Sequence, residues 1–211
     1  MNKILIVLTV AIVAAVIFFV PPIKGLGEVA KIIFFHVPTA WVSVVAFFAS
    51  AWYAAKFLRT NDFTADALSA RATRLGFVFV LLSTVSGAIF SKLTWGAYWN
   101  WDPRQTTIFV LILIYGAYLT LRAAVADEKV RAKVSAVYSL LSVLTVPFPV
   151  FILPRMYFSL HPSPVLNSAG RVEMDAVVLI VLIAAVIDAT LIFFAVDEVW
   201  EVLTDVAGGC R

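Results

Sequence analysis

The sequence predicts an all-α integral membrane protein, a bundle of six transmembrane helices, and two observations lead to this prediction. Of the 211 residues, 63% are hydrophobic and only 14% are charged, whereas a soluble domain is nearer half apolar and a quarter charged. The apolar residues also fall into six runs, each close to the ~20 residues that a helix needs to cross a bilayer. We therefore expect the surplus apolar surface to face lipid, in a single membrane domain that covers residues 1–211.

The six spans are expected at about 4–20, 37–58, 75–92, 106–122, 134–153 and 175–196. The first follows Lys3 as a signal peptide would, but FFVPPIKG at its end offers no small-x-small cleavage site, so we interpret it as a span. Pro38 suits the first turn of the second span, where its missing N–H costs little. Pro147 and Pro149 are expected to kink the fifth span near its outer end.

The basic residues orient this bundle. With the N-terminus inside, the inner segments hold ten lysines and arginines and the outer segments hold six. Both termini are therefore expected in the cytoplasm. The net charge of +3 is modest, and no block of like charge indicates nucleic-acid binding. Cys210 is the only cysteine, which excludes an intramolecular disulfide and a CxxC pair, and it has no evident role.

The unusual residues fall in the outer segments. The stretch TWGAYWNWD, from Thr94 to Asp102, places three tryptophans, a tyrosine and an aspartate between two apolar runs. The only two histidines are His36, just before the second span, and His161, in the loop before the sixth. By this topology both imidazoles and the aromatic block lie on one face of the membrane, and each comes from a different outer loop.

This set of side chains fits haem, a flat apolar disc with a central iron and two carboxylates on one edge. The iron takes imidazole nitrogens as axial ligands, and His36 and His161 can supply two of them. The disc needs apolar or aromatic walls, which four residues can form: Trp95, Tyr98, Trp99 and Trp101. The propionates need a cation, which one of three residues can provide: Arg104, Lys92 or Arg155.

The shape of the aromatic block stays open at this stage. In a helix, Trp95, Trp99 and Asp102 would share one side. In an extended chain, Trp95, Trp99 and Trp101 would share one face instead. Gly96 and Pro103 permit either conformation. Asp102 is an acceptor that could orient Arg104 or an indole N–H. A belt of interfacial aromatics explains a lone tryptophan better than three in seven residues with an aspartate and an arginine attached.

Asp188 lies inside the sixth span, where an ionisable side chain is costly and is a functional hypothesis by default. Two interpretations are open. One is a proton relay. The other, which we favour, is a hydrogen bond to a neighbouring helix through a serine, threonine or tyrosine, such as Ser43, Thr84 or Ser142.

These residues together resemble a known family. WGAYWNWD is similar to the tryptophan-rich WWD signature of haem-handling proteins in cytochrome c maturation, and the six-span plan and the length most resemble CcmC, the haem exporter protein C family. KIIFFHVPTAW resembles the family's first outer loop and second span. WGAYWNWDPRQTT resembles its second outer loop, here about residues 92–107, and its fourth span. SLHPSP resembles the third outer loop through its histidine alone.

The resemblance implies that haem b is bound non-covalently, as cargo, at the outer face of a prokaryotic inner membrane. It implies delivery to a membrane-anchored periplasmic haem chaperone, with subunits of an ABC-type transporter and a small single-span accessory protein as further partners, and no enzymatic activity. It makes His36 and His161 the axial ligands. The WWD signature is matched by six residues: Trp95, Gly96, Trp99, Trp101, Asp102 and Arg104. This sequence departs from the signature at Asn100, Pro103 and Gln105. Pro103 disfavours a continuous helix through Asp102.

Two other functions compete with this interpretation. A b-type electron-transfer subunit would place histidine pairs within its spans, where we expect none. A secondary transporter would use midplane polar residues and broken helices, for which Asp188 and the two prolines of the fifth span are the candidates. An ATPase is excluded by the lack of a GxxxxGK[ST] phosphate loop.

Overall fold

The computed structural model describes residues 3–23, 25–148, 152–156, 159–160 and 174–208, apart from the side chains of 154–155 and 197–208. His161, Pro149 and Cys210 lie outside the described residues. The elements named in the described residues are helices: α1 (Lys3–Phe18), the 3-10 turn η1 (Glu28–Ile32), α2 (Ile33–Thr60), α3 (Phe63–Trp95), α4 (Pro103–Ala124), α5 (Glu128–Val143), α6 (Leu153–Met156) and α7 (Ala176–Gly208).

Four helices in this part of the chain are long and apolar enough to cross a membrane: Glu28–Thr60, Phe63–Trp95, Pro103–Ala124 and Ala176–Val196. α1 is apolar but shorter, with 16 residues. The all-helical membrane architecture is therefore confirmed, and the crossing of the bilayer by six helices stays a prediction.

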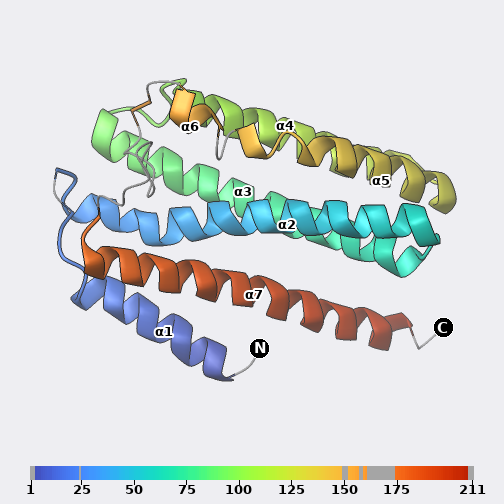
Figure 1. Cartoon of the computed structure of the whole chain (residues 1–211), viewed down its shortest axis with the longest axis horizontal. Helices are drawn as coiled ribbons and strands as arrows, with labels where there is room; N and C mark the ends of the chain where they lie inside the picture. The colour runs from blue at the N-terminus through green and yellow to red at the C-terminus, as the bar shows by residue number, and fades with distance from the viewer. Residues whose placement is uncertain (1–2, 24, 149–151, 157–158, 161–173, 209–211) are drawn as a thin grey trace.

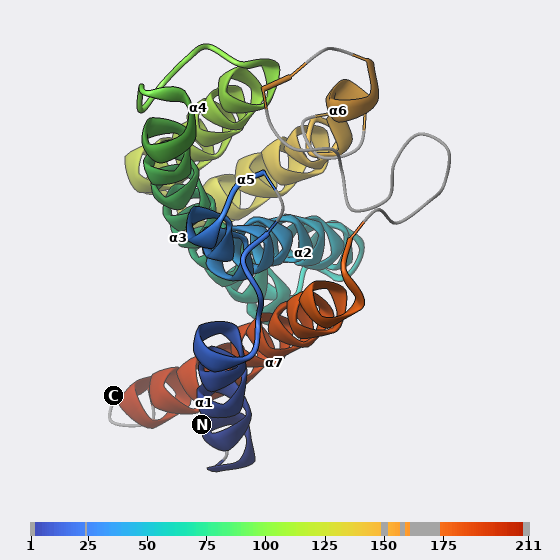
Figure 2. The ribbon, with the colours of Figure 1, turned by 90° about the vertical axis from the view of Figure 1, so that its left-hand side faces the viewer.

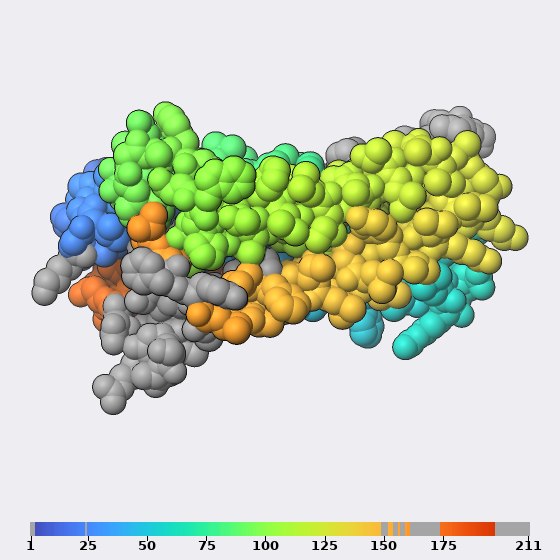
Figure 3. Space-filling model, turned by 90° about the horizontal axis from the view of Figure 1, so that it is seen from above, coloured from blue at the N-terminus to red at the C-terminus, as the bar shows by residue number. Residues whose placement is uncertain are grey.

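The helices lie side by side and alternate in direction (Figure 1). α2 packs along α3 and also contacts α5 and α7, while α1 rests on α7. Seen from the end, α3, α4 and α5 lie on one side of α2, and α7 and α1 lie on the other (Figure 2). α4 and α5 run next to each other along the face shown in Figure 3.

Because the helices alternate, the segments that join them gather at two ends. At one end, which we call the site end, α1 and α3 finish and α2, α4 and α7 begin (Figure 1). Segments 19–23, 25–32 and 96–102 lie there, so the helix alternation does bring the His36 region and the aromatic block to the same end, as the sequence predicted. The turns at 61–62 and 125–127 lie at the opposite end, which we call the far end.

α2 begins at Ile33, earlier than the expected start of the second span. His36 is therefore a residue of the helix itself and does not precede it. Pro38 lies inside the helix and not in its first turn, which corrects the expected position of that proline. The 3-10 turn η1 runs directly into α2, so the chain is already helical before α2 begins.

α5 ends at Val143, before the two prolines that were expected to kink the fifth span. The chain continues in tight turns, in which the amides of Thr145 and Val146 donate to the carbonyls of Ser142 and Val143 at 3.0 and 3.2 Å. The ring of Pro147 would collide with the carbonyl four residues earlier, that of Val143, if the α-helix continued. The predicted interruption of the fifth span is therefore present. The α-helix ends at Val143, the residue whose carbonyl the Pro147 ring would meet.

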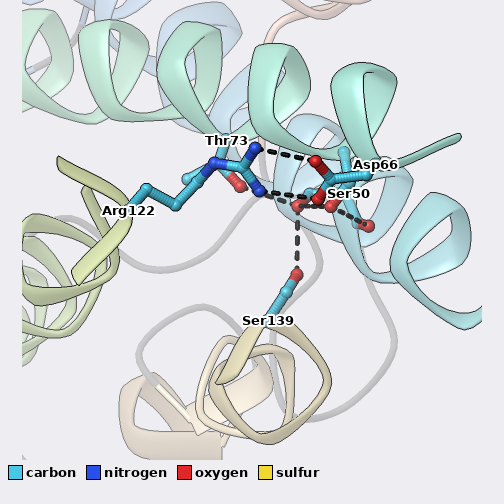
Figure 4. A network of polar contacts seen from close by, with 6 residues as sticks. Ser50, Asp66, Thr73, Arg122 and Ser139 are labelled. Carbon is cyan, nitrogen blue, oxygen red and sulfur yellow. Dashed lines mark hydrogen bonds and ion pairs between the residues drawn. The ribbon is translucent and has the colours of Figure 1, made fainter. Parts of the chain in front are cut away.

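Buried hydroxyls join three helices in the half of the bundle nearer the far end (Figure 4). Ser50 Oγ of α2 lies 2.6 Å from Thr73 Oγ1 and 3.1 Å from Ser69 Oγ of α3. It also lies 3.0 Å from Ser139 Oγ of α5. All four side chains are buried. Because each hydroxyl can donate once and accept twice, such a cluster satisfies itself without water and sets how α2, α3 and α5 meet.

Asp188 joins α7 to α1. Its side chain is buried, and Oδ2 lies 2.9 Å from Thr9 Oγ1. The favoured interhelical hydrogen bond is therefore present, but its partner is Thr9 and not one of the hydroxyls named from the sequence, Ser43, Thr84 or Ser142. Thr9 Oγ1 also lies 2.9 Å from the carbonyl of Leu5. The Thr9 hydroxyl therefore lies within donating distance of an acceptor in its own helix and of the carboxylate of α7.

Asp188→Asn is expected to fold and to keep α1 paired with α7, because the side-chain amide keeps an oxygen that can accept from Thr9 Oγ1. Asp188→Leu should lower the free energy of unfolding by about 1 kcal/mol, the size of an interhelical hydrogen bond in a membrane bundle. The loss should appear as a lower thermal midpoint in detergent. Asp175→Leu, at the exposed start of α7, is the control. Equal thermal midpoints for Asp188→Leu and wild type would contradict the assignment.

Candidate functional site

His36 is held against α3 by its Nδ1 atom. This atom lies 3.0 Å from the carbonyl oxygen of Ser83 and 3.2 Å from Ser86 Oγ. A carbonyl can only accept, so Nδ1 must carry the hydrogen, and in the neutral imidazole the second ring nitrogen, Nε2, then has a lone pair. Nε2 makes no hydrogen bond to any residue that the structure describes. A neutral imidazole with one nitrogen fixed by a carbonyl and the other bare is the form in which histidine binds a metal.

The His36 ring also lies against the backbone of α3 at Gly87. A Cβ added at Gly87 would meet His36 Cε1 at 3.0 Å, tighter than ordinary van der Waals contact. Only glycine therefore leaves the ring undisturbed in this position. The three holding residues, Ser83, Ser86 and Gly87, were missed from the sequence. Their spacing of i, i+3 and i+4 puts them on one helix face, which was the available signal.

The aromatic block is neither a continuous helix nor an extended strand. α3 ends at Trp95, and Gly96 caps it with φ +82°, its amide donating to the carbonyl of Lys92 at 3.2 Å. Residues 97–101 form an irregular loop, in which Trp101 has φ +55°. α4 then begins at Pro103, with Asp102 as its N-cap. Proline is favoured at the first helical position because its fixed φ suits the helix and its missing N–H is not needed there.

Two residues that depart from the WWD signature hold this loop together. The Asn100 side chain donates to Ser91 Oγ at 2.7 Å, and Ser91 Oγ donates to the carbonyl of Ala97 at 2.7 Å. The backbone N–H of Asn100 donates to Gln105 Oε1 at 2.8 Å. Gln105 and Ser91 are buried. The loop is therefore fixed at both ends, to the last turns of α3 and to the first turn of α4.

The expected aromatic wall is divided in two. Trp95 packs edge-on against Phe90 with ring centroids 5.5 Å apart. Trp99 packs edge-on against Trp101 at 5.9 Å. Trp101 is 70% exposed and Tyr98 is 60% exposed, and apolar surface of this extent is available for a ligand. Trp101 and Tyr98 therefore present the open rings, while Trp95 and Trp99 are half-buried, Trp95 against Phe90 and Trp99 against Phe109.

Lys92, one of the three expected cations, contacts the turn at the end of α3. Its ammonium donates to the carbonyl of Gly96 at 2.9 Å and lies 5.7 Å from the centroid of the Tyr98 ring. It therefore stabilises the turn at the end of α3 and orients Tyr98. Arg155, the third expected cation, has its side chain outside the described part of the structure.

Asp102 lies 5% exposed at the start of α4. Its Oδ1 accepts from the amide of Arg104 at 2.9 Å, and both carboxylate oxygens accept from Ser159 Oγ, at 2.9 and 2.8 Å. The amide of Leu160 donates to Oδ2 at 2.7 Å. Asp102 thus joins the WWD loop to residues 159–160, and His161 is the next residue in the sequence. The sequence had suggested an acceptor for Arg104, and the atom that donates is the Arg104 backbone N–H.

Arg104 is half-buried in the first turn of α4, and its positive charge acts on the His36 imidazole and is attracted to Asp102. Among the described residues nothing accepts a hydrogen bond from its buried Nε. A buried guanidinium N–H with no acceptor is unusual. It is the position where an anionic oxygen of a ligand would be accepted, beside the histidine that has a bare nitrogen.

The site end therefore brings together seven of the predicted site residues: His36, Gly96, Tyr98, Trp99, Trp101, Asp102 and Arg104. Trp95 lies at the same end with its ring against α3, and His161 is outside the described residues. These residues are of the types that could hold a flat apolar ligand with an anionic edge and a metal.

The chain matches the family model described as CcmC, heme exporter protein C, over residues 1–206. Heme exporter protein C of Bradyrhizobium diazoefficiens is 30% identical over 167 residues, which are 79% of this chain and 63% of that protein. The protein of the same name in Rhodobacter capsulatus is 28% identical over 164 residues, 75% of this chain and 63% of that protein. Cytochrome c biogenesis protein CcsA of Lobularia maritima is 31% identical over 114 residues, 54% and 33% respectively. The chain thus spans less than two thirds of the length of these three relatives.

Proposed function

The chain belongs to the heme exporter protein C family, membrane proteins of haem handling in cytochrome c maturation, and from this premise we propose that it binds haem at the site end and delivers it to a haem chaperone. His36 supplies one axial nitrogen to the iron, and His161 supplies the other. The haem is b-type, is bound without a covalent link, and is cargo.

The observation that carries this proposal is the state of His36. Its Nδ1–H is fixed by the carbonyl of Ser83 at 3.0 Å, which leaves Nε2 as a bare donor to iron. The charge of Arg104 acts on the same imidazole, so a propionate can be neutralised while the iron is bound. The exposed rings of Trp101 and Tyr98 offer the apolar face that the porphyrin needs.

The topology that goes with this function has six crossings of a prokaryotic inner membrane, both termini in the cytoplasm and the site end on the periplasmic side. α1 and α5 are then the two crossings beyond the four long helices. The basic segments 59–74 and 122–133, which are helix ends around the turns at 61–62 and 125–127, support this orientation because they lie at the far end. The whole of residues 1–211 then acts as one membrane domain.

The partners in this proposal are a membrane-anchored periplasmic chaperone that receives the haem, the ABC-type transporter subunits of the maturation system and a small single-span accessory protein. An open aromatic rim supports such a transfer, because Trp101 and Tyr98 are more than half exposed and a second protein can reach a ligand that rests on them. The chain's own contribution is to hold and present haem, with no bond made or broken in the porphyrin.

The test is haem content after purification from cells that make haem but lack the chaperone, so that no recipient removes it. We expect haem near one per chain, with the low-spin spectrum of two imidazole ligands. Addition of purified apo-chaperone should move the haem to it. If the wild-type protein never retains haem under these conditions, haem binding is refuted. If it retains haem that the chaperone cannot take, delivery is refuted and binding stands.

A further inference from the structure

A second concave site lies at the far end, away from His36 and the WWD loop. It is a cavity of about 520 Å³ between α3, α4 and α5, lined by Arg74, Leu119, Arg122, Ala123 and Arg131. Three of the five lining residues are arginines. One comes from each helix, so the cavity exists only where the three helices meet.

Two of the three arginines of this cavity have no carboxylate partner among the described residues. Arg122 donates to both carboxylate oxygens of Asp66, at 2.7 and 2.8 Å (Figure 4). Its guanidinium is therefore fixed in place and neutralised. Arg74 and Arg131 form no ion pair in the described part of the chain. In that part, two positive charges consequently face one cavity without an anion, and guanidinium groups are suited to hold phosphate oxygens in this setting.

The position of the cavity relative to the membrane indicates which kind of anion it binds. Arg74 directly precedes the apolar run LGFVFVLLSTVSGAIF of α3, and Arg122 directly follows the apolar run IFVLILIYGAYLTL of α4. Both arginines thus mark the boundary of the membrane at the far end. Lipid phosphates lie at this level, and basic pockets between helices on the inner side are where anionic headgroups bind. Leu119 and Ala123 add apolar lining for the carbon chain that follows a phosphate.

We propose that this cavity binds the phosphate headgroup of an anionic phospholipid of the inner leaflet. Arg74 and Arg131 bind the phosphate. Arg122, whose guanidinium is fixed by Asp66, is the third arginine that lines the site. The lipid fills the space between α3, α4 and α5 at the end opposite the haem site, and in doing so it braces those helices.

The experiment compares Arg74→Gln/Arg131→Gln with Lys129→Gln/Lys133→Gln, which removes the same charge from exposed positions outside the cavity. Arg122 is left intact so that its ion pair with Asp66 survives. Each purified protein is placed in nanodiscs of phosphatidylcholine with or without phosphatidylglycerol. Bound lipid after exchange into detergent is measured by mass spectrometry, and the thermal midpoint is recorded in each nanodisc.

Wild type and the lysine variant should retain phosphatidylglycerol and melt higher when it is present. The arginine variant should retain about tenfold less, because each basic residue near the surface adds appreciably to anionic-lipid binding. Equal retention by the two variants, or equal retention of the two lipids by wild type, overturns the proposal. An equal rise in melting temperature with inorganic phosphate in phosphatidylcholine alone assigns the site to a soluble anion and also overturns it. A co-purifying protein that replaces the lipid overturns it likewise. Haem content is independent of all these outcomes.

Discussion

His36→Ala is expected to reduce haem retention by at least about 100-fold, because it removes an axial nitrogen, and loss of a supporting residue alone costs about 10–100-fold in metal affinity. The absorption spectrum of any haem that remains should change from low-spin to high-spin. The helical content should be unchanged, since His36 contributes only a hydrogen bond to Ser83 and Ser86 at the α2–α3 contact. A haem spectrum identical to that of wild type would show that His36 is not a ligand.

Gly87→Ala tests the same site without touching the imidazole. The new methyl group would stand 3.0 Å from His36 Cε1, so the ring must rotate or shift and its Nε2 atom moves with it. We expect haem affinity to fall about tenfold, the lower end of the range for residues that orient a metal ligand, and the spectrum to broaden.

Gly116→Ala is the matched control for Gly87→Ala. A Cβ at Gly116 would meet only the Phe77 ring, at 3.8 and 3.9 Å, which is ordinary contact, and alanine in a helix interior is intrinsically favoured over glycine by up to about 1 kcal/mol. This variant should keep its haem and melt at the same temperature or higher. Equal loss of haem in both glycine variants would mean that helix packing in general, and not the His36 ring, controls binding.

The sequence was most informative where the chemistry is rare. His36, one of two histidines in 211 residues, and a dense aromatic block could be assigned to one end of a bundle by helix alternation alone. The same assignment of His161 lies outside the described residues and stays a prediction. The start of α4 could also have been predicted, because an aspartate followed by proline is an N-cap signal, although both a helix and an extended chain were left open there. The helices α2, α3, α4 and α7 cover the expected spans and extend beyond them.

The rest depended on contacts between segments far apart in the sequence. Which face of α3 meets His36 decides that Ser83, Ser86 and Gly87 hold the ring, and no local pattern fixes that choice. Asn100 and Gln105 stood out only as departures from a signature, yet they hold the loop in place. Thr9 could not be named as the partner of Asp188 because a sequence does not tell which helices are neighbours.

Asp102→Asn is expected to lower haem retention about 10–100-fold through the segment that it holds, and not through contact with haem. The carboxylate accepts from Ser159 Oγ and from the amide of Leu160, immediately before His161. Asparagine caps a helix about as well as aspartate, so α4 should still begin at Pro103. An amide has only one acceptor oxygen, however, and its NH₂ group would face N–H or O–H donors. The cost in unfolding free energy should be about 1–3 kcal/mol, measured by thermal or urea unfolding.

Asp127→Asn provides the matched control for that cap. Asp127 caps α5 by accepting from the amide of Val130 at 2.8 Å, and it is exposed. Asparagine at this position can still cap α5, and the carboxylate that it replaces is exposed. Haem content and stability should therefore both stay within error of wild type. If Asp127→Asn and Asp102→Asn behave alike, the hydrogen bonds to residues 159–160 contribute nothing to haem binding.

A double-mutant cycle then decides how Asp102 acts. If the carboxylate works by placing the segment that leads into His161, then Asp102→Asn should cost little more haem affinity once His161→Ala is present, because contacts that share one pathway are not additive. If Asp102 instead contacts the haem itself, the two losses should add. Ser159→Ala should reproduce part of the Asp102→Asn effect in the first case and none of it in the second. The coupling between Asp102 and His161 therefore decides whether the WWD aspartate positions the segment that leads into His161 or contacts the haem.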